Sequence, residues 1–290
     1  MPWIGELCSI LAAMTWALGV ITYKRLGESL SPLALNLMKN CLVMAMLLPT
    51  VWLAHGSLWP NMSTQALFIT VLSGALGISI ADTMYFRALN ELGAGRMGII
   101  GNLFSPSVIF LAYMFLGERL TVLQMTGFLF VLFGVYMVNR RRADAPGKVS
   151  RKGVLLGVGA ILLSAVGIVM VKPVLETEPF FQVAMVRMLG AIMFMIVLVP
   201  VLGQRVVWPS WGAIPWRILW LGAFLGQYLS MLLWLAGYKY IEASVASILN
   251  ETASIFILIF AWLLLGETLD RRKLIGVALT FLGVFIMIFA

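Results

Sequence analysis

Charged side chains inside apolar stretches are the residues of this sequence that could do chemistry. Lys39, Asp82, Arg187 and Glu251 each stand within a long apolar run. Burying such a group in a membrane costs about 2.5–3.5 kcal/mol, so each needs a partner or a water-filled cavity. A buried carboxyl group can take up and release a proton near neutral pH, which makes Glu251 the candidate for proton or cation coupling.

Depth along the apolar runs sorts these charges into two sets. Lys39, Asp82 and the amide of Asn102 lie at similar distances from one end of their runs, and Arg187 and Glu251 lie at similar distances from the other end. We therefore expect one set in each half of the membrane, with Lys39 and Arg187 holding a substrate carboxylate or neutralising the acid of their own set. Two alternatives stay open: purely structural ion pairs, and a Lys39 side chain that extends toward the membrane surface.

A proline adds a further polar feature beside Asn102. Pro106 provides no N–H for the carbonyl four residues earlier, which is that of Asn102. A kink there would leave this carbonyl and the side-chain amide free to bind a substrate or an ion. The alternative is a packing kink in which the hydroxyl of Ser105 or Ser107 satisfies the backbone.

Aromatic and amide side chains are candidates to line the same cavity. They are Trp16, Tyr85, Gln227, Tyr228 and Trp234. The candidate residues for substrate binding or coupling are therefore Lys39, Asp82, Tyr85, Asn102, Arg187, Gln227, Trp234 and Glu251.

The composition is that of a membrane protein. Of 290 residues, 62% are hydrophobic and 11% charged, and the mean hydropathy is +1.01, whereas a soluble chain is about 45–50% apolar and about 25% charged. The net charge of +8 is then a sign of topology, not of nucleic-acid binding. Cys8 and Cys41 are too few and too isolated for a disulfide framework or a metal site, and we expect no cofactor. The N-terminus lacks a basic segment before its long apolar run, so we expect a retained helix and no cleaved signal.

Ten apolar runs of membrane-spanning length predict an all-α polytopic protein. They cover residues 4–24, 33–54, 66–89, 94–116, 121–139, 153–172, 180–201, 213–239, 243–265 and 272–290. The basic connection 140–152 divides them into two five-helix repeats, 1–139 and 153–290.

The two halves share a sequence motif. "FLGERLTVLQMTGFLFVLFGVYMV" begins at Phe115, and "LLGETLDRRKLIGVALTFLGVFIM" begins 149 residues later at Leu264. Because each repeat has an odd number of spans, the second copy enters the membrane upside down, as in many secondary transporters. Small residues at every fourth position of the third and eighth spans predict that these two helices cross each other tightly, or else that they serve ordinary close packing without a functional role. They are Ser73, Gly77 and Ala81, which recur as Gly222, Gly226 and Ser230.

The start of the motif predicts a joint between two helices. Gly117 and Gly266 suit the left-handed turn that ends a helix, and Thr121 and Asp270 suit the N-cap of the next one. The Thr-x-x-Gln spacing also resembles a capping box. Glu118 and its counterpart are then either part of this joint or functional carboxylates.

These motifs, with "AMTWALGVITYK" in the first span, resemble the EamA repeat of the drug/metabolite transporter superfamily. The resemblance covers nearly the whole chain. It implies a ten-helix carrier with a central cavity between its halves, which moves amino acids, other metabolites or drugs, commonly outward. It also implies cytoplasmic termini.

The distribution of basic residues predicts the opposite orientation. Of the eighteen Lys and Arg residues in or beside connections, fifteen follow odd-numbered spans. The positive-inside rule then places the odd loops in the cytoplasm and both termini outside.

We therefore predict a secondary transporter that alternates access around a midplane cavity. We expect a multi-pass protein of a bacterial inner membrane, an exporter with a small-molecule substrate and the lipid bilayer as partners, with a proton as an optional coupling ion. An uncoupled uniporter and, less favoured, a structural membrane protein are the alternatives. No metalloprotease, nucleotide-binding, nucleophile-elbow or CxxC motif indicates an enzyme. Substrate, coupling ion, direction of flux and oligomeric state are left open.

Overall fold

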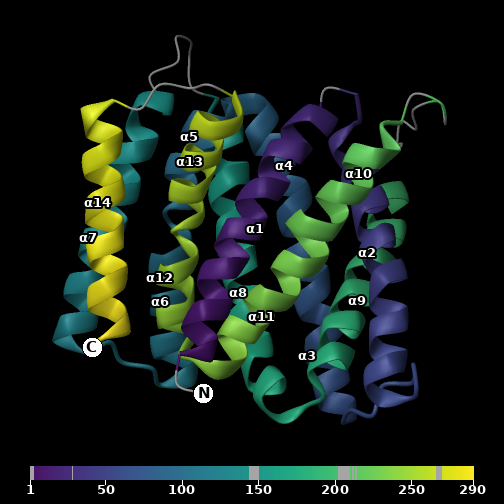
Figure 1. Cartoon of the computed structure of the whole chain (residues 1–290). Coiled ribbons are helices and arrows are strands. Elements are labelled where there is room, and N and C mark those ends of the chain that lie inside the picture. The colour runs from purple at the N-terminus through teal and green to yellow at the C-terminus, as the bar shows by residue number, and fades with distance from the viewer. Residues whose placement is uncertain are drawn as a thin grey trace.

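The computed structural model describes residues 3–27, 29–143, 150–201, 210, 212, 214–265 and 270–290. Helices dominate this part of the chain (Figure 1). Their bounds are α1 Ile4–Leu26, α2 Pro32–His55, α3 Thr64–Gly74, α4 Ala81–Leu92, α5 Ala94–Gly101, α6 Phe104–Leu116, α7 Val122–Ala143, α8 Arg151–Thr177, α9 Phe180–Val201, α10 Trp216–Ala223, α11 Ser230–Tyr240, α12 Ala243–Asn250, α13 Ala253–Leu265 and α14 Arg271–Ile288.

Within the described residues, eight helical stretches are long and apolar enough to cross a membrane. Each corresponds to one of the ten predicted spans. The other two predicted spans are helical as α7 and α14, but the apolar part of α7 ends at Val138 and α14 begins with three basic residues. The chain is thus an all-α protein with multiple membrane spans, and the count of ten stays a prediction.

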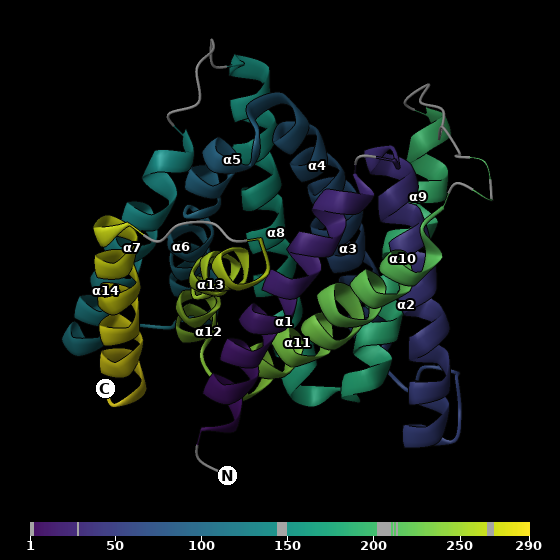
Figure 2. The ribbon, with the colours of Figure 1, turned by 45° about the horizontal axis from the view of Figure 1, so that its top comes forward.

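The connections after even-numbered spans lie at one end of the bundle, and those after odd-numbered spans lie at the other end. The start of α1 and the end of α14 lie at the same end (Figure 1, bottom). We call this the even end, and we call the opposite end, where α1 finishes, the odd end. The turned view in Figure 2 shows α7 and α14 side by side at one edge of the bundle. Nearer the centre are α1, α8 and the span formed by α10 and α11 in succession.

The glycines of the duplicated motif pack α7 against α14. A Cβ atom on Gly127 would lie 2.8 Å from the carbonyl oxygen of Gly283, and one on Gly134 would lie 2.6 Å from that of Gly276. The repeat pairs Gly127 with Gly276 in sequence, but in space each glycine meets the other one because the helices are antiparallel. Side chains at these positions would push the two backbones apart.

The helix joint has the geometry that its sequence predicts. Gly117 adopts the left-handed conformation with φ 72°. Thr121 and Gln124 exchange the two hydrogen bonds of a capping box, at 2.9 and 3.1 Å. In the second repeat Asp270 caps α14, whereas Gly266 and Glu267 lie outside the described residues.

The third and eighth spans do not pack tightly against each other. Each is crossed by the first helix of the opposite repeat: α1 packs against α10 and α11, and α8 packs against α3 and α4. A Cβ atom on Gly19 would overlap the Cα atom of Gly226, and one on Gly167 would lie 3.1 Å from the Cα atom of Gly77. The predicted crossing of the third span with the eighth is therefore wrong, and the small residues instead serve close crossings of each span with the first helix of the opposite repeat.

Both of these spans contain one turn of π-helix at matching positions. The segments are Ala75–Ile80 between α3 and α4 and Phe224–Leu229 between α10 and α11, which are 149 residues apart. A π-helical turn shifts the helix face that follows it and is frequent at functional sites. The first π-helical turn directly precedes the helix that carries Asp82, and the second contains Gln227.

Candidate functional site

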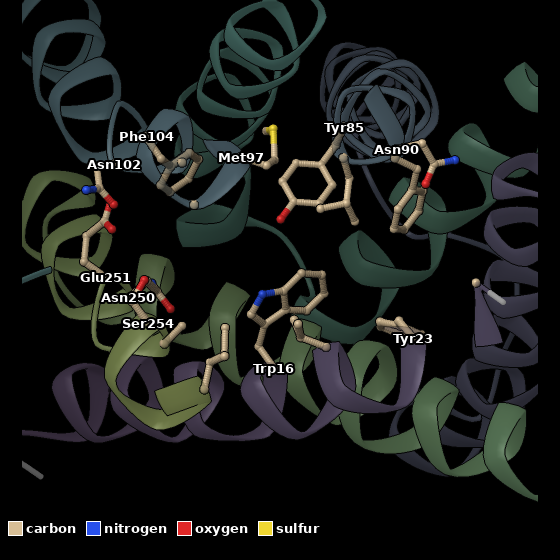
Figure 3. A pocket seen from close by; sticks show the side chains of 18 of the residues that line it. Trp16, Tyr23, Tyr85, Asn90, Met97, Asn102, Phe104, Asn250, Glu251 and Ser254 are labelled. Atoms are coloured by element: carbon tan, nitrogen blue, oxygen red, sulfur yellow. The ribbon is translucent and has the colours of Figure 1, made fainter. Parts of the chain in front are cut away.

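A cavity of about 570 Å³ opens between the repeats. Residues of α5 such as Met97 and Gly98 line one side, and residues of α13 such as Ser254 and Ile257 line the other. Its lining extends to Gly27 and to other residues at the odd end. Figure 3 shows Trp16 and Tyr85 projecting into it from facing helices. The aromatic residues of the wall are Trp16, Tyr23, Tyr85, Phe86 and Phe104.

Two matching helix breaks place polar groups at this cavity. The helix of the fourth span is interrupted at Asn102 and Leu103, between α5 and α6, and that of the ninth span at Glu251 and Thr252, between α12 and α13. The backbone N–H groups of Asn102 and Glu251 donate to carbonyls three residues earlier, at 3.2 and 3.1 Å. The breaks put Asn102 and Glu251 into the cavity wall.

Proline does not account for both breaks. Pro106 lies in the first turn of α6, where its missing N–H would have had no helical partner. The corresponding residue in the second repeat is Ile255, yet that helix breaks at the same position. Of the two predicted hydroxyls, Ser107 bonds to the carbonyl of Leu103, while Ser105 bonds elsewhere.

The Glu251 carboxylate is bound across the boundary between the repeats. Its Oε1 accepts a hydrogen bond from the hydroxyl of Ser105 on α6, at 2.6 Å. The same hydroxyl lies 3.2 Å from the carbonyl oxygen of Ser247 on α12. Figure 3 shows the Asn102 amide and the Glu251 carboxyl group directed toward one another. The acid therefore contacts both repeats.

Lys39 and Asp82 form a buried ion pair beside a second, inner cavity. Lys39 Nζ lies 3.1 Å from Asp82 Oδ2 and donates to Gln227 Oε1 at 3.0 Å. The Lys39 side chain is fully buried, so it does not extend to the membrane surface. The inner cavity, of about 290 Å³, is lined by Asp82, Gln227 and Arg187.

Arg187 does not pair with Glu251, contrary to the prediction. Its Nε donates to Ser73 Oγ at 3.0 Å, and its guanidinium group lies over the ring of Trp234, 5.2 Å from the centroid. The two sets that depth along the spans predicted are therefore not the sets that meet in the structure. Instead, Asn102 is beside Glu251, and Arg187 faces the inner cavity with Lys39 and Asp82.

The two cavities adjoin each other. Both linings include Trp16, Tyr85, Phe86, Phe104, Asn250 and Ala253. All eight candidate residues except Lys39 line one or both cavities, and Lys39 contacts two residues that do. Tyr228 shares a hydrogen bond with Thr50 and is not in either lining.

Sequence reasoning missed several polar contacts. No sequence pattern indicated Ser105 as the partner of Glu251 or Ser73 as the partner of Arg187. Glu118 has a partner 125 residues away, on α12, which no local pattern could indicate. The described residues contain no group of three or more His, Cys, Asp or Glu side chains that could hold a metal ion.

Comparisons with known proteins agree with this architecture. The model of the EamA-like transporter family matches residues 3–140 and 151–289. No curated protein matches the chain. A solved structure described only as "Crystal structure of protein" is similar over 97% of this chain and 95% of its own, with a TM-score of 0.79 and 18% sequence identity. That likeness concerns the fold alone.

Proposed function

This chain belongs to the EamA-like transporter family, and on that basis we propose that it is a proton-coupled exporter of small metabolites or drugs, amino acids among them. Its two inverted repeats alternate between states in which the central cavity is open to one side of the membrane or to the other. The acid that couples the cycle to protons is Glu251.

One asymmetry between equivalent contacts carries this proposal. Helix α6 of the first repeat packs against α12 of the second, and Val108 and Ala112 share a buried cluster with Ala243 and Ala246. The offset of 149 residues makes α13 the equivalent of α6 and α5 the equivalent of α12, so the equivalent contact would lie between α13 and α5. There, instead, the cavity separates the two helices. Exchanging the two arrangements would close the odd end and open the even end, which is alternating access.

Polar contacts also hold the even end together. Lys172 on α8 donates to the carbonyl oxygens of Tyr238 and Ile241, both at 3.0 Å, and pairs with Glu176 at 2.7 Å. These bonds join α8 to the connection between α11 and α12. They brace the second repeat at the even end.

The site of Glu251 suits a coupling role. It lies at a helix break, faces the cavity and bonds to the opposite repeat through Ser105. The equivalent residue of the first repeat is Asn102, so one acid serves both halves. A change in the protonation of Glu251 alters the hydrogen bond that links α6 to the end of α12. In the proposed cycle, the parts that move are the contact between α6 and α12 and the equivalent gap between α5 and α13.

The proposed orientation follows from the basic loops. If the odd end faces the cytoplasm, the cavity as described receives substrate from inside the cell, in agreement with export across a bacterial inner membrane. A reporter fused to Ala290 should then be active only outside the cytoplasm. Cytoplasmic activity would reverse the orientation, and with it the proposed direction.

The coupling is tested by transport. Thermal-shift screening of the purified protein against amino acids, nucleosides and cationic drugs identifies a ligand, because a molecule that binds only the folded state raises the melting temperature. Uptake of that ligand into proteoliposomes is then measured with and without a pH gradient. We expect the gradient to accelerate uptake by the wild type and not by Glu251→Gln. Equal uptake by the wild type under both conditions would identify an uncoupled uniporter.

Alternating access is tested by cysteine labelling in a Cys8→Ser, Cys41→Ser background. Gly98→Cys reports on the lining at the odd end, and Ala246→Cys on the buried contact between α6 and α12. Impermeant maleimide should label the first from the odd side. Glu251→Gln, which removes the charge, should change the two labelling rates in opposite directions. Rates that rise or fall together would indicate loosening of the fold instead of alternation.

A further inference from the structure

The guanidinium group of Arg187 is a buried cation without a carboxylate partner. The residue is 2% exposed. Its Nε bonds to Ser73, but its two terminal nitrogens bond to no residue in the described part of the chain, and no carboxylate there lies within ion-pair distance. The Ser73 hydroxyl in turn donates to the carbonyl of Gly167 at 2.6 Å, which fixes its oxygen as the acceptor for Arg187. The guanidinium group is thus held in place with its terminal donors free at the inner cavity.

The charges around the inner cavity do not cancel. Lys39 and Asp82 neutralise each other through their ion pair. Arg187 therefore leaves one net positive charge beside a cavity of about 290 Å³. An uncompensated cation is costly in surroundings of low dielectric constant, and a bound anion would remove that cost.

Gln227 supplies a neutral donor to the same cavity. Lysine can only donate hydrogen bonds, so the contact of 3.0 Å from Lys39 Nζ requires the oxygen of the Gln227 amide on that side. The amide NH₂ group consequently faces away from Lys39. It bonds to no described residue, and Gln227 lines the inner cavity beside Arg187.

The outer cavity offers a different environment. Its wall is largely aromatic, with Trp16, Tyr85 and Phe104 shared between the two cavities. A molecule that spans both would have an anionic group at one end and an apolar body at the other. From this arrangement we propose that the inner cavity is a carboxylate subsite, in which Arg187 and Gln227 hold the anionic end of an organic acid whose apolar body lies among the aromatic residues of the outer cavity.

This inference deepens the proposed transport function by naming the chemical class of its substrate. It assigns Arg187 and Gln227 to substrate contact, and it assigns Ser73 and Trp234 to positioning of the guanidinium group. The Lys39–Asp82 pair is a positioning element too, because it orients the amide of Gln227.

The test is a direct binding measurement on the purified full chain in detergent. Phenylacetate, phenylacetamide and phenethylamine have the same ring and differ in the charge of the end group. We expect phenylacetate to bind roughly tenfold more tightly than either of the others, a difference of about 1.4 kcal/mol, because only its charged carboxylate pairs with the guanidinium group. Arg187→Met should abolish this preference, and Gln227→Leu should weaken it. The control Arg217→Met, at an exposed position of α10, should retain it.

A second variant protects the test against misfolding of Arg187→Met. Gln227→Glu keeps an oxygen for Lys39 and adds a negative charge that cancels the net charge of Arg187, so it should abolish the preference for phenylacetate. Equal binding of the three probes to the wild type, or an unchanged preference in both Arg187→Met and Gln227→Glu, would overturn the subsite.

Transport assays separate the two proposals. Arg187-dependent binding of phenylacetate without its transport into proteoliposomes would uphold the subsite and count against the transport function. Transport of phenethylamine by a wild-type protein that does not prefer phenylacetate would uphold the transport function and count against the carboxylate subsite.

Discussion

Glu118 of the first repeat caps a helix of the second: its Oε1 accepts the backbone N–H of Ala243 at 2.7 Å. Its Oε2 accepts the N–H and the hydroxyl of Ser244, at 2.9 and 2.7 Å. The free N–H groups at the start of α12 are thus satisfied by a carboxylate from the loop between α6 and α7. Of the two sequence-based alternatives, the geometry favours a joint, but one that links the repeats as well as two successive helices.

Removing this cap should loosen the even end. Loss of a capping side chain costs about 0.5–2 kcal/mol, so Glu118→Ala should lower the melting temperature and raise the labelling of Ala246→Cys from the even side. Glu118→Gln, which keeps an acceptor but no charge, should have an intermediate effect. Glu6→Gln is the control because Glu6 makes no bond to a described residue. Unchanged labelling in Glu118→Ala would mean that the cap does not hold the closed state.

The ion pair of Lys39 and Asp82 should behave as a unit. Lys39→Met leaves the carboxylate without its cation and should destabilise the protein by about 3 kcal/mol, the lower end for a broken buried pair, because the Asp82 side chain is 26% exposed. The double variant Lys39→Met, Asp82→Leu should recover most of that loss. Thermal unfolding of the single and double variants gives the coupling energy, and purely additive losses would contradict the pairing.

The crossing of α1 over the eighth span should not tolerate a methyl group. Gly226→Ala places a Cβ atom against the Cα atom of Gly19, where only backbone could move, and should cost about 1–3 kcal/mol. Gly101→Ala is the matched control, because its Cβ atom would have no neighbour within 4 Å. The measurement is the melting temperature of each variant. Alanine favours a helix more than glycine does, so Gly101→Ala should not lower the melting temperature, and an equal loss in both variants would contradict the role of the crossing.

Ser105 should matter where Ser107 does not. Ser105→Ala removes the donor to Glu251 and should cost about 1.5–3 kcal/mol, as for a hydrogen bond to a charged group. It should also move the pH at which Ala246→Cys labelling is half-maximal. Ser107→Ala removes only a bond to the backbone of its own helix, to Leu103, and should leave that pH unchanged. The same midpoint in both variants would dissociate Ser105 from the proton response.

Glu242, between α11 and α12, should make stability depend on pH. Burial raises its pKa above the ordinary 4.5, the charge of Glu118 raises it further, and Lys172 opposes the rise. The folded state therefore favours the neutral acid, so this contribution to stability falls as pH rises from 4.5 through the folded pKa. We expect Glu242→Gln to be more stable than the wild type at neutral pH and equal to it below the unfolded pKa. Melting temperatures across this range provide the check; a constant difference would exclude the titration of Glu242 as its cause.

The sequence by itself determined the helical spans, the inverted repeat and the local ends of helices. Apolar runs identify spans because lipid cannot satisfy a free backbone. Gly117 and Thr121 were predictable because a left-handed turn and a capping box involve only residues within a helical turn of each other. The family resemblance was confirmed over both repeats, at residues 3–140 and 151–289.

Only the tertiary structure decided which polar groups meet. Counting residues along the spans gave the wrong groups, because the two π-helical turns and the break at Glu251 rotate successive faces of the spans in ways that the sequence did not indicate. Arg187 therefore lies over Trp234 and not against Glu251. Glu118 reaches α12 across 125 residues of chain. Such contacts depend on how whole helices cross, and crossings are set by the sum of many packing contacts between the repeats, which no short stretch of sequence contains.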